Sequence, residues 1–303
     1  MTVTRAGYAA LLGRPNVGKS TLLNRLIGQK ISITAPKPQT TRHVILGIQT
    51  LPEAQIVYVD TPGLHRQNRR AMNRYLNRSA ASVLGYVDVV IFLIEALRWS
   101  AEDEDVRQRL SGFAGPVVLA VNKVDRVADK GQLLPFLQER AAQQSFTEIV
   151  PLAAINGDNV AALEQAIIRL LPEQDFLYPE DQITTASERF LAAELIREKL
   201  TRLLRAELPY ALTVEIERFV EEGSLVRIHA LIWVERASQK GIVIGEKGAL
   251  LREVGRQARQ DLERLLDRKV FLETWVKVRE GWSDDERALQ SLGYANPDSG
   301  RSA

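Results

Sequence analysis

The chain has 303 residues, a length that suggests two globular domains. Hydrophobic residues make up 45% of it and charged residues 26%, values typical of soluble globular proteins, which excludes disorder along most of its length. The formal charge at pH 7 is +2 and cysteine is absent, so any basic surface must be local, and a disulfide framework or a thiolate metal site is excluded.

The N-terminal residues make a poor targeting segment. A single arginine precedes a short apolar run, which is broken at residues 13–15. No stretch reaches the roughly 18 uncharged apolar residues that suggest a membrane span. We therefore expect a cytoplasmic protein.

Short apolar runs alternate with longer amphipathic segments up to residue 172. This alternation predicts a mostly parallel α/β sheet. The expected buried strands are residues 8–12, 55–59, 87–94, 116–121 and 148–152.

The pattern changes after residue 172. Residues 172–187 hold two prolines and little periodicity, which is typical of a connector. Beyond them the sequence predicts an α+β domain. Its expected elements are a helix at 188–206, strands at 211–220 and 225–235, a helix at 249–266 and a strand at 270–278. We divide the chain into a first domain at 1–172, a linker at 173–188, a second domain at 189–293 and a disordered tail at 294–303.

Residues 13–20 fit the pattern G-x-x-x-x-G-K-[ST] and lie between a predicted strand and an amphipathic helix. The glycines let backbone N–H groups face phosphate oxygens, Lys19 neutralises the β and γ phosphates, and Ser20 supplies an oxygen to Mg²⁺. The alternative is a glycine turn that caps a helix, with Lys19 in solvent. The predicted phosphate-binding residues are Gly13, Asn16, Val17, Gly18, Lys19, Ser20, Thr21 and Gly63.

Residues 60–63 read Asp-Thr-Pro-Gly and follow a buried strand. The carboxylate of Asp60 therefore lies at the carboxyl end of a strand, beside the phosphate loop, where it would hold Mg²⁺. The amide of Gly63 can approach a γ-phosphate and sense it. Taken alone, such a segment is most often a turn.

Residues 122–125 read Asn-Lys-Val-Asp after another apolar run. A carboxylate only accepts hydrogen bonds, so Asp125 suits the N1–H and the exocyclic amine of guanine. Asn122 can bond near the base, and the stem of Lys123 can lie along its face. By itself this segment could be a charged loop.

Together these motifs resemble the translation-factor-like branch of P-loop GTPases, over the whole predicted first domain. The resemblance implies that residues 38–43 are the effector loop, with Thr41 as the Mg²⁺-binding threonine and Thr40 as its rival. It also makes Ala153 and Ala154 the final guanine-contacting pair. The family usually has Ser-Ala there, so Ala153 predicts weaker ordering of the loop.

Leu64 stands where Ras-like proteins carry the glutamine that orients the attacking water. A leucine cannot do so, which predicts slow hydrolysis by the protein alone. Asn16 matches an asparagine that coordinates a monovalent cation, K⁺, in potassium-stimulated relatives. A turn residue near the helix is the equal alternative.

A second glycine motif, G-x-x-G, lies at residues 245–248. Alone it is very weak evidence. Its surroundings strengthen it, because residues 240–260 hold five basic and two acidic residues, and a predicted helix follows with three arginines on one face. The candidate RNA-binding residues are Lys240, Gly245, Glu246, Lys247, Gly248, Arg252, Arg256 and Arg259.

The order of elements around this loop resembles a type II KH domain, which clamps the backbone of single-stranded nucleic acid. With the first domain it resembles the Era family of bacterial ribosome-assembly GTPases over nearly the whole chain. That resemblance implies a GTPase that binds GTP or GDP and Mg²⁺, the 3′ end of small-subunit ribosomal RNA and the immature small subunit. It implies weak inner-membrane association too, which nothing in the sequence requires, and no DNA binding. The alternative is an RNA-binding assembly protein in which the guanine nucleotide is a structural ligand.

A basic stripe follows Gly63. Arg66, Arg70, Arg74 and Arg78 recur every four residues, with Arg69 beside them and no acidic residue up to residue 85. A solvated helix face and a nucleotide-dependent contact with RNA or the ribosome both remain open.

Overall fold

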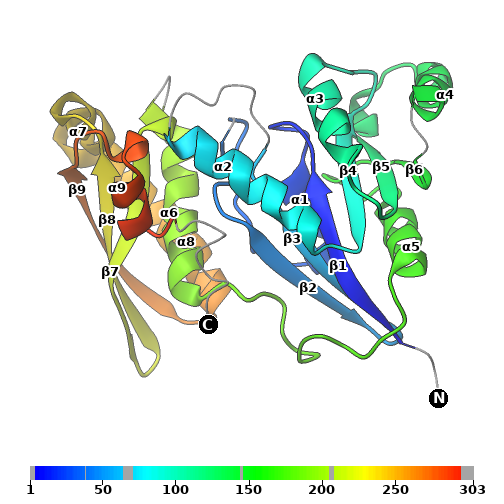
Figure 1. Cartoon of the computed structure of the whole chain (residues 1–303). Coiled ribbons are helices and arrows are strands. Elements are labelled where there is room, and N and C mark those ends of the chain that lie inside the picture. The colour runs from blue at the N-terminus through cyan, green and yellow to red at the C-terminus, as the bar shows by residue number, and fades with distance from the viewer. Residues whose placement is uncertain (1–3, 38, 64–70, 144–145, 205–207, 295–303) are drawn as a thin grey trace. The chain divides into compact units, whose positions relative to one another are not determined.

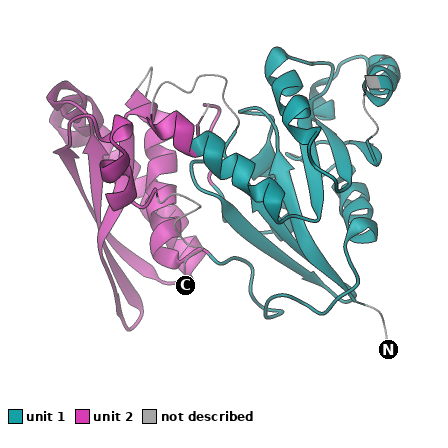
Figure 2. Ribbon diagram, in the orientation of Figure 1, with its two compact units in different colours: residues 1–32, 41–68, 76–185 teal, residues 33–40, 69–75, 186–303 magenta. Residues whose placement is uncertain are grey.

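The computed structural model describes residues 4–37, 39–63, 71–143, 146–204 and 208–294. These residues divide into two compact units, coloured separately in Figure 2. The first unit contains residues 1–32, 41–68 and 76–185, and the second contains 33–40, 69–75 and 186–303. The predicted linker up to residue 185 is therefore part of the first unit.

Apart from two consecutive strands, the elements of the first unit alternate between strands and helices along the chain (Figure 1). Its strands are β1 (Arg5–Leu12), β2 (Ile45–Leu51), β3 (Ala54–Asp60), β4 (Val89–Glu95), β5 (Val117–Asn122) and β6 (Glu148–Pro151). Its helices are α1 (Lys19–Ile27), α3 (Ala101–Leu110), α4 (Leu133–Gln143) and α5 (Val160–Leu170), and α2 (Ala71–Ser82) has residues in both units. Short 3-10 turns lie at η1 (Val83–Gly85), η2 (Val124–Arg126) and η3 (Lys130–Gln132).

The strands of the first unit form one sheet in the order β2-β3-β1-β4-β5-β6. All described neighbours pair in parallel except β2, which is antiparallel to β3. Strand β2 was not expected from the sequence; it lies at the sheet edge and four of its seven residues are only partly buried, whereas every residue of β3 is buried. The mostly parallel α/β prediction is confirmed.

Residues 173–184 run along this sheet as an ordered segment. The side chain of Gln55, which is fully buried, accepts from the N–H groups of Leu177 and Tyr178 and donates to the carbonyl of Tyr178. The N–H of Ile48 on β2 donates to Ile183. The buried side-chain amide of Gln55, bonded through both its oxygen and its nitrogen, therefore attaches this segment to the sheet of the first unit.

The second unit has a three-stranded sheet in the order β7-β8-β9, with helices packed against one face. Its strands are β7 (Leu212–Glu222), β8 (Leu225–Val234) and β9 (Lys269–Val278). Its helices are α6 (Glu188–Leu203), α7 (Ala237–Ile244), α8 (Ala249–Leu266) and α9 (Glu286–Ser291), with 3-10 turns at η4 (Leu208–Tyr210), η5 (Glu246–Gly248) and η6 (Trp282–Asp284). β7 and β8 are antiparallel, while β8 and β9 are parallel. The expected α+β order is confirmed.

Tyr294, the first residue of the predicted tail, is 2% exposed. Its ring stacks on Trp282, and its hydroxyl bonds to Thr213. The folded second unit therefore extends at least to this residue, which corrects the predicted tail there. Residues 295–303 lie outside the described part of the chain.

Candidate nucleotide and RNA sites

The carboxyl ends of four strands place the predicted nucleotide-binding segments at one edge of the first sheet. Residues 13–18 follow β1, Asp60 ends β3, Asn122 ends β5, and Ala153 lies two residues beyond β6. Ligands of open α/β sheets bind at this edge. The sheet therefore collects segments that are far apart in the sequence.

The phosphate loop, residues 13–20, leads directly into α1. Gly18 is the N-cap residue, with φ 109°, and a Cβ there would lie 2.3 Å from Nδ2 of Asn122, so only glycine fits. Nζ of Lys19 donates to the carbonyls of Gly13 (2.9 Å) and Arg14 (3.1 Å). Burial lowers the pKa of Lys19 to about 8, although nearby Asp60 opposes that effect.

Three oxygen-bearing side chains meet beside Lys19. Oγ of Ser20 lies 2.7 Å from Oγ1 of Thr41 and donates to Oδ2 of Asp60 at 2.7 Å. The hydroxyl of Thr40 instead donates to the carbonyl of Lys37. This geometry favours Thr41 over Thr40 as the metal-binding threonine.

These residues fit Mg²⁺. Asp60 is fully buried, and its Oδ1 has no hydrogen-bond partner among the described residues. Burial raises the pKa of this carboxyl, while hydrogen bonds and Lys19 counteract the rise. In the described part of the chain no group of three or more His, Asp or Glu side chains is placed to hold a metal ion by itself. One carboxylate and two hydroxyls, together with phosphate oxygens, are oxygen ligands of the kind that Mg²⁺ prefers.

Ser32 is a member of this cluster that the sequence did not indicate, and its buried hydroxyl donates to Oδ2 of Asp60 at 2.8 Å. It lies outside every motif, so no local pattern could have revealed it.

Gly63 packs against the phosphate loop, because a Cβ there would lie 3.0 Å from the nitrogen of Pro15. Asn16 is exposed, with φ 62°, a conformation that asparagine tolerates. Its cation-binding role therefore stays a prediction.

The guanine segment is tied to the phosphate loop through Asn122. Its Nδ2 donates to the carbonyl of Val17 at 2.7 Å, and its Oδ1 accepts from the N–H of Ala154 at 2.9 Å. Asp125 is exposed in η2, and the ammonium of Lys123 pairs with Glu95 at 3.1 Å.

The N–H of Ala153 donates to the carbonyl of Asp158, and its carbonyl accepts from Gly157. These bonds close the loop. The N–H of Ala154 is bonded to Asn122, and the roles of Ala153 and Ala154 in contacting guanine, like the weaker ordering of the loop, stay predictions.

In the second unit, the segment that precedes Thr41 is held by α6. The carboxylate of Glu198 accepts from the N–H of Thr34 at 2.9 Å, and the guanidinium of Arg197 donates to the carbonyl of Thr40. Glu194 holds Arg197 through two hydrogen bonds of 2.7 and 2.6 Å. These charged groups of α6 are buried, which requires such pairing.

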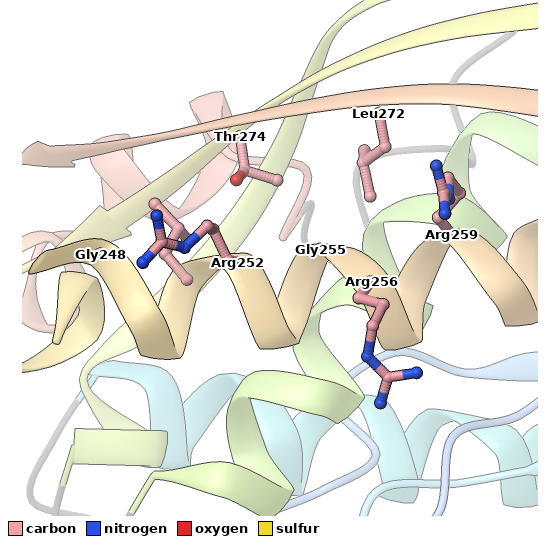
Figure 3. A pocket seen from close by; sticks show the side chains of 8 residues that line it. Gly248, Arg252, Gly255, Arg256, Arg259, Leu272 and Thr274 are labelled. Carbon is pink, nitrogen blue, oxygen red and sulfur yellow. The ribbon is translucent and has the colours of Figure 1, made fainter.

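The G-x-x-G segment forms η5 between α7 and α8. Gly248 is the N-cap of α8, with φ 78° and open space where a Cβ would stand, and the carbonyl of Lys247 accepts from Arg252. Beside it is a groove of about 500 Å³ (Figure 3). Its lining residues are Gly248, Leu251, Arg252, Gly255, Arg256, Arg259, Leu272 and Thr274.

The structure therefore brings Gly248 and the three predicted arginines together in one groove. Lys240 lies exposed on α7, and Lys240, Gly245, Glu246 and Lys247 are not among the lining residues. Gly255 was not expected there, nor were Leu272 and Thr274 of β9, which face α8 in Figure 3. Two sequence patterns could have indicated these lining residues: the four-residue spacing from Leu251 to Gly255 on one helix face, and the two-residue spacing of Leu272 and Thr274 on one face of a strand.

Of the basic stripe, Arg66, Arg69 and Arg70 lie outside the described residues, as does Leu64. Arg74 lies 3.6 Å from Glu286. No helix in the described part of the chain has the length and apolarity needed to cross a membrane.

The fold and the two sites define the class: a P-loop GTPase domain joined to a KH domain. The "50S ribosome-binding GTPase" family model matches residues 8–123, and the "KH domain" model matches residues 207–283. Among curated proteins, GTPase Era of Ectopseudomonas mendocina is 57% identical over 292 residues, covering 96% of this chain and 98% of that protein. GTPase Era of Azotobacter vinelandii is 57% identical over 290 residues, covering 96% and 97%.

Two solved structures match with a TM-score of 0.92 at 39% identity. One is a point variant of Aquifex aeolicus Era bound to GDP·AlF4⁻, covering 96% of this chain and 100% of that one. The other is Era with MgGDPNP and nucleotides 1506–1542 of 16S ribosomal RNA, covering 96% and 99%. The chain belongs to the Era family of GTPases.

Proposed function

We propose that this protein is a GTP-hydrolysing switch that binds the 3′ end of small-subunit ribosomal RNA and assists assembly of the small subunit. The observation that carries the switch is the convergence of Ser20, Thr41 and Asp60 beside Lys19. Thr41 belongs to the segment between α1 and β2, so a nucleotide that engages its hydroxyl also restrains that segment.

The chain's own residues supply binding and orientation. Lys19 and the N-terminus of α1 bind the phosphates, Gly63 brings an amide to the γ-phosphate, and Asp125 selects guanine. Mg²⁺, held by Ser20, Thr41 and Asp60, would neutralise charge on the phosphate oxygens.

Asn16 is proposed to hold K⁺ in the phosphate loop. The sequence has leucine where a water-orienting glutamine would stand, so another source of charge stabilisation is needed for fast turnover. Equal hydrolysis rates in sodium and potassium would remove this role and leave the GTPase assignment intact.

RNA binding is proposed for the groove beside Gly248. A relative of the same fold binds nucleotides 1506–1542 of 16S ribosomal RNA. In this chain the groove joins a helix N-terminus to three arginines and to a small residue, Gly255, which leaves room for a backbone or base.

Steady-state phosphate release by the purified full chain tests the switch. We expect slow turnover that rises when RNA from the 3′ end of 16S ribosomal RNA, or small subunits, are added. The matching family model is named for GTPases that bind the 50S subunit, so the stimulation of turnover by small subunits should be compared with that by large subunits. Turnover that no RNA or subunit changes would favour the alternative, in which the nucleotide is a structural ligand.

The cytoplasmic location and the weak inner-membrane association are further proposals. Partition of the protein between cytosol and membrane fractions tests both.

A further inference from the structure

A carboxylate outside the nucleotide motifs joins the phosphate loop to the guanine segment. Glu95 is the last residue of β4 and pairs in register with Asn122 at the end of β5. Its Oε2 lies 3.0 Å from Nη2 of Arg14, in the phosphate loop, and 3.1 Å from Nζ of Lys123. One oxygen atom thus contacts a cation from each of two nucleotide-binding segments.

The arrangement is anchored on its buried side. The Arg14 side chain is 6% exposed, and its Nε donates to Oδ2 of Asp103 at 3.1 Å. Asp103 is fully buried and also accepts from the N–H and hydroxyl of Ser100, with which it forms the capping box of α3. The guanidinium is therefore held at two points, so Glu95 contacts a fixed partner.

Glu95 is ionised at neutral pH. Burial alone would raise its pKa, but the hydrogen bonds from Lys123 and Arg14 hold the pKa of this carboxyl below its usual value. Its side chain is 22% exposed and that of Lys123 19%, so the pair is less screened than a surface ion pair.

The ion pair with Glu95 restrains the side chain of Lys123. Its backbone has φ 66°, a left-handed conformation that is uncommon for residues other than glycine and that often occurs at functional sites. A lysine side chain has four rotatable bonds and loses considerable entropy when it is held. Fixing its ammonium before the nucleotide arrives would remove this cost from binding.

We propose that Glu95 is a positioning residue for the guanine nucleotide: it holds the Lys123 stem where the base packs and couples it through Arg14 to the phosphate loop. This inference rests on the proposed role of Lys123 and Asp125 in guanine binding. Asn122 makes one link between the two segments, and Glu95 makes a second link by charge.

The test is dissociation of a fluorescent GDP analogue from the full chain with Mg²⁺, measured by stopped flow. Glu95→Gln is expected to speed dissociation about tenfold, which corresponds to about 1.4 kcal/mol of lost coupling. Lys123→Met should do the same, and the double variant should be no faster than the faster single one. Rate increases that multiply in the double variant would show that the two residues act independently and would overturn the proposal.

Two further variants separate positioning from folding. Glu148→Gln removes the partner of Arg169, an ion pair of 2.9 Å at the start of β6, and should leave dissociation unchanged. Glu95→Asp keeps the charge and should restore most of the slow dissociation, which general loosening of the fold would not allow. Faster dissociation from Glu148→Gln, or no rescue by Glu95→Asp, would count against positioning.

Asp125→Asn distinguishes this inference from the proposed base site. If it moves preference from GTP to XTP while Glu95→Gln dissociates like the parent, the base site stands and the positioning role falls. If it retains GTP preference, the assignment of the guanine segment itself is wrong.

Discussion

Recognition of the base is proposed to depend on a single exposed carboxylate. Asp125 is exposed in η2, which follows β5 at the edge of the sheet where the phosphate loop lies, and its ionised side chain can only accept hydrogen bonds. Selectivity for guanine should therefore reside in this side chain and be exchangeable.

We expect Asp125→Asn to prefer XTP, because an amide can donate to the carbonyl of xanthine where the carboxylate accepted from the amine of guanine. Mismatched polar groups of this kind cost about 1 to 3 kcal/mol each. Competition between GTP and XTP measures the change. Continued preference for GTP would mean that another group reads the base.

Lys19 is expected to make nucleotide binding depend on pH. Its pKa of about 8 in the free protein should rise when phosphate charges approach, so binding takes up a proton near and above pH 8. Affinity is then lost as the pH rises through 8, by up to about tenfold per pH unit.

Calorimetric titration of GDP in two buffers of different ionisation enthalpy counts that proton. We expect uptake of about half a proton at pH 8 from this group and almost none two units lower. Binding at pH 8 without proton uptake would show that Lys19 is fully charged in the free protein.

Among the helices and strands, α8 and the loop before it are the elements predicted to bind RNA. Gly248 is the N-cap of α8 in a left-handed conformation, and nothing lies within 4 Å of the position of an added Cβ. Aspartate tolerates this conformation better than most residues and caps helices well.

We therefore expect Gly248→Asp to fold normally and bind GTP normally but to lose binding of single-stranded RNA. The side chain would block the approach of the backbone and repel phosphate beside Arg252. A titration with labelled RNA from the 3′ end of 16S ribosomal RNA measures the loss. An unchanged affinity, with a native circular dichroism spectrum, would remove this loop from the RNA site.

Helix α6 contributes to the stability of the fold through buried charged side chains. Arg197 is 1% exposed and forms two hydrogen bonds with Glu194. Replacing it by an uncharged residue removes a cation that pairs with a buried carboxylate.

We expect Arg197→Met to lower the free energy of unfolding by about 3 kcal/mol, as for other buried pairs that lose one partner. Arg268→Met is the control, because both side chains of its ion pair with Glu221 are exposed, at 39% and 53%, and its loss should cost less than about 1 kcal/mol. Urea unfolding followed by tryptophan fluorescence compares them. Equal costs for the two variants would contradict the role given to burial.

On the scale of the whole molecule, the two units do not follow the order of the sequence. Residues 33–40 precede most of the first sheet but pack within the second unit, where α6 holds them. The segment next to Thr41 is thus part of the unit that carries the RNA groove.

A fragment of residues 1–185 should consequently lose the order of this segment. Without Glu198, the N–H of Thr34 has lost its acceptor, so we expect faster amide hydrogen exchange over residues 33–40 than in the full chain. Amides of β1 are the internal control and should be unchanged. Equal protection of residues 33–40 in both proteins would contradict this division.

The sequence alone determined the class of this protein and indicated most of its proposed nucleotide site. Each nucleotide motif is a short continuous run of residues that directly follows or ends one predicted strand. These motifs are the phosphate loop, the run that begins at Asp60 and the segment from Asn122 to Asp125. The mostly parallel sheet follows from the alternation of apolar runs with amphipathic segments, apart from β2, which the sequence did not indicate. Local patterns such as these require no knowledge of distant contacts.

Tertiary structure decided what depends on residues far apart in the chain. It separated Thr41 from Thr40 by placing one hydroxyl against Ser20 and turning the other to Lys37. It also brought Glu95 to Arg14 and Lys123. In the RNA groove it added β9 to a helix that the sequence had already identified. These contacts arise from packing and burial, which select a partner by position in space, so no spacing along the sequence could have revealed them.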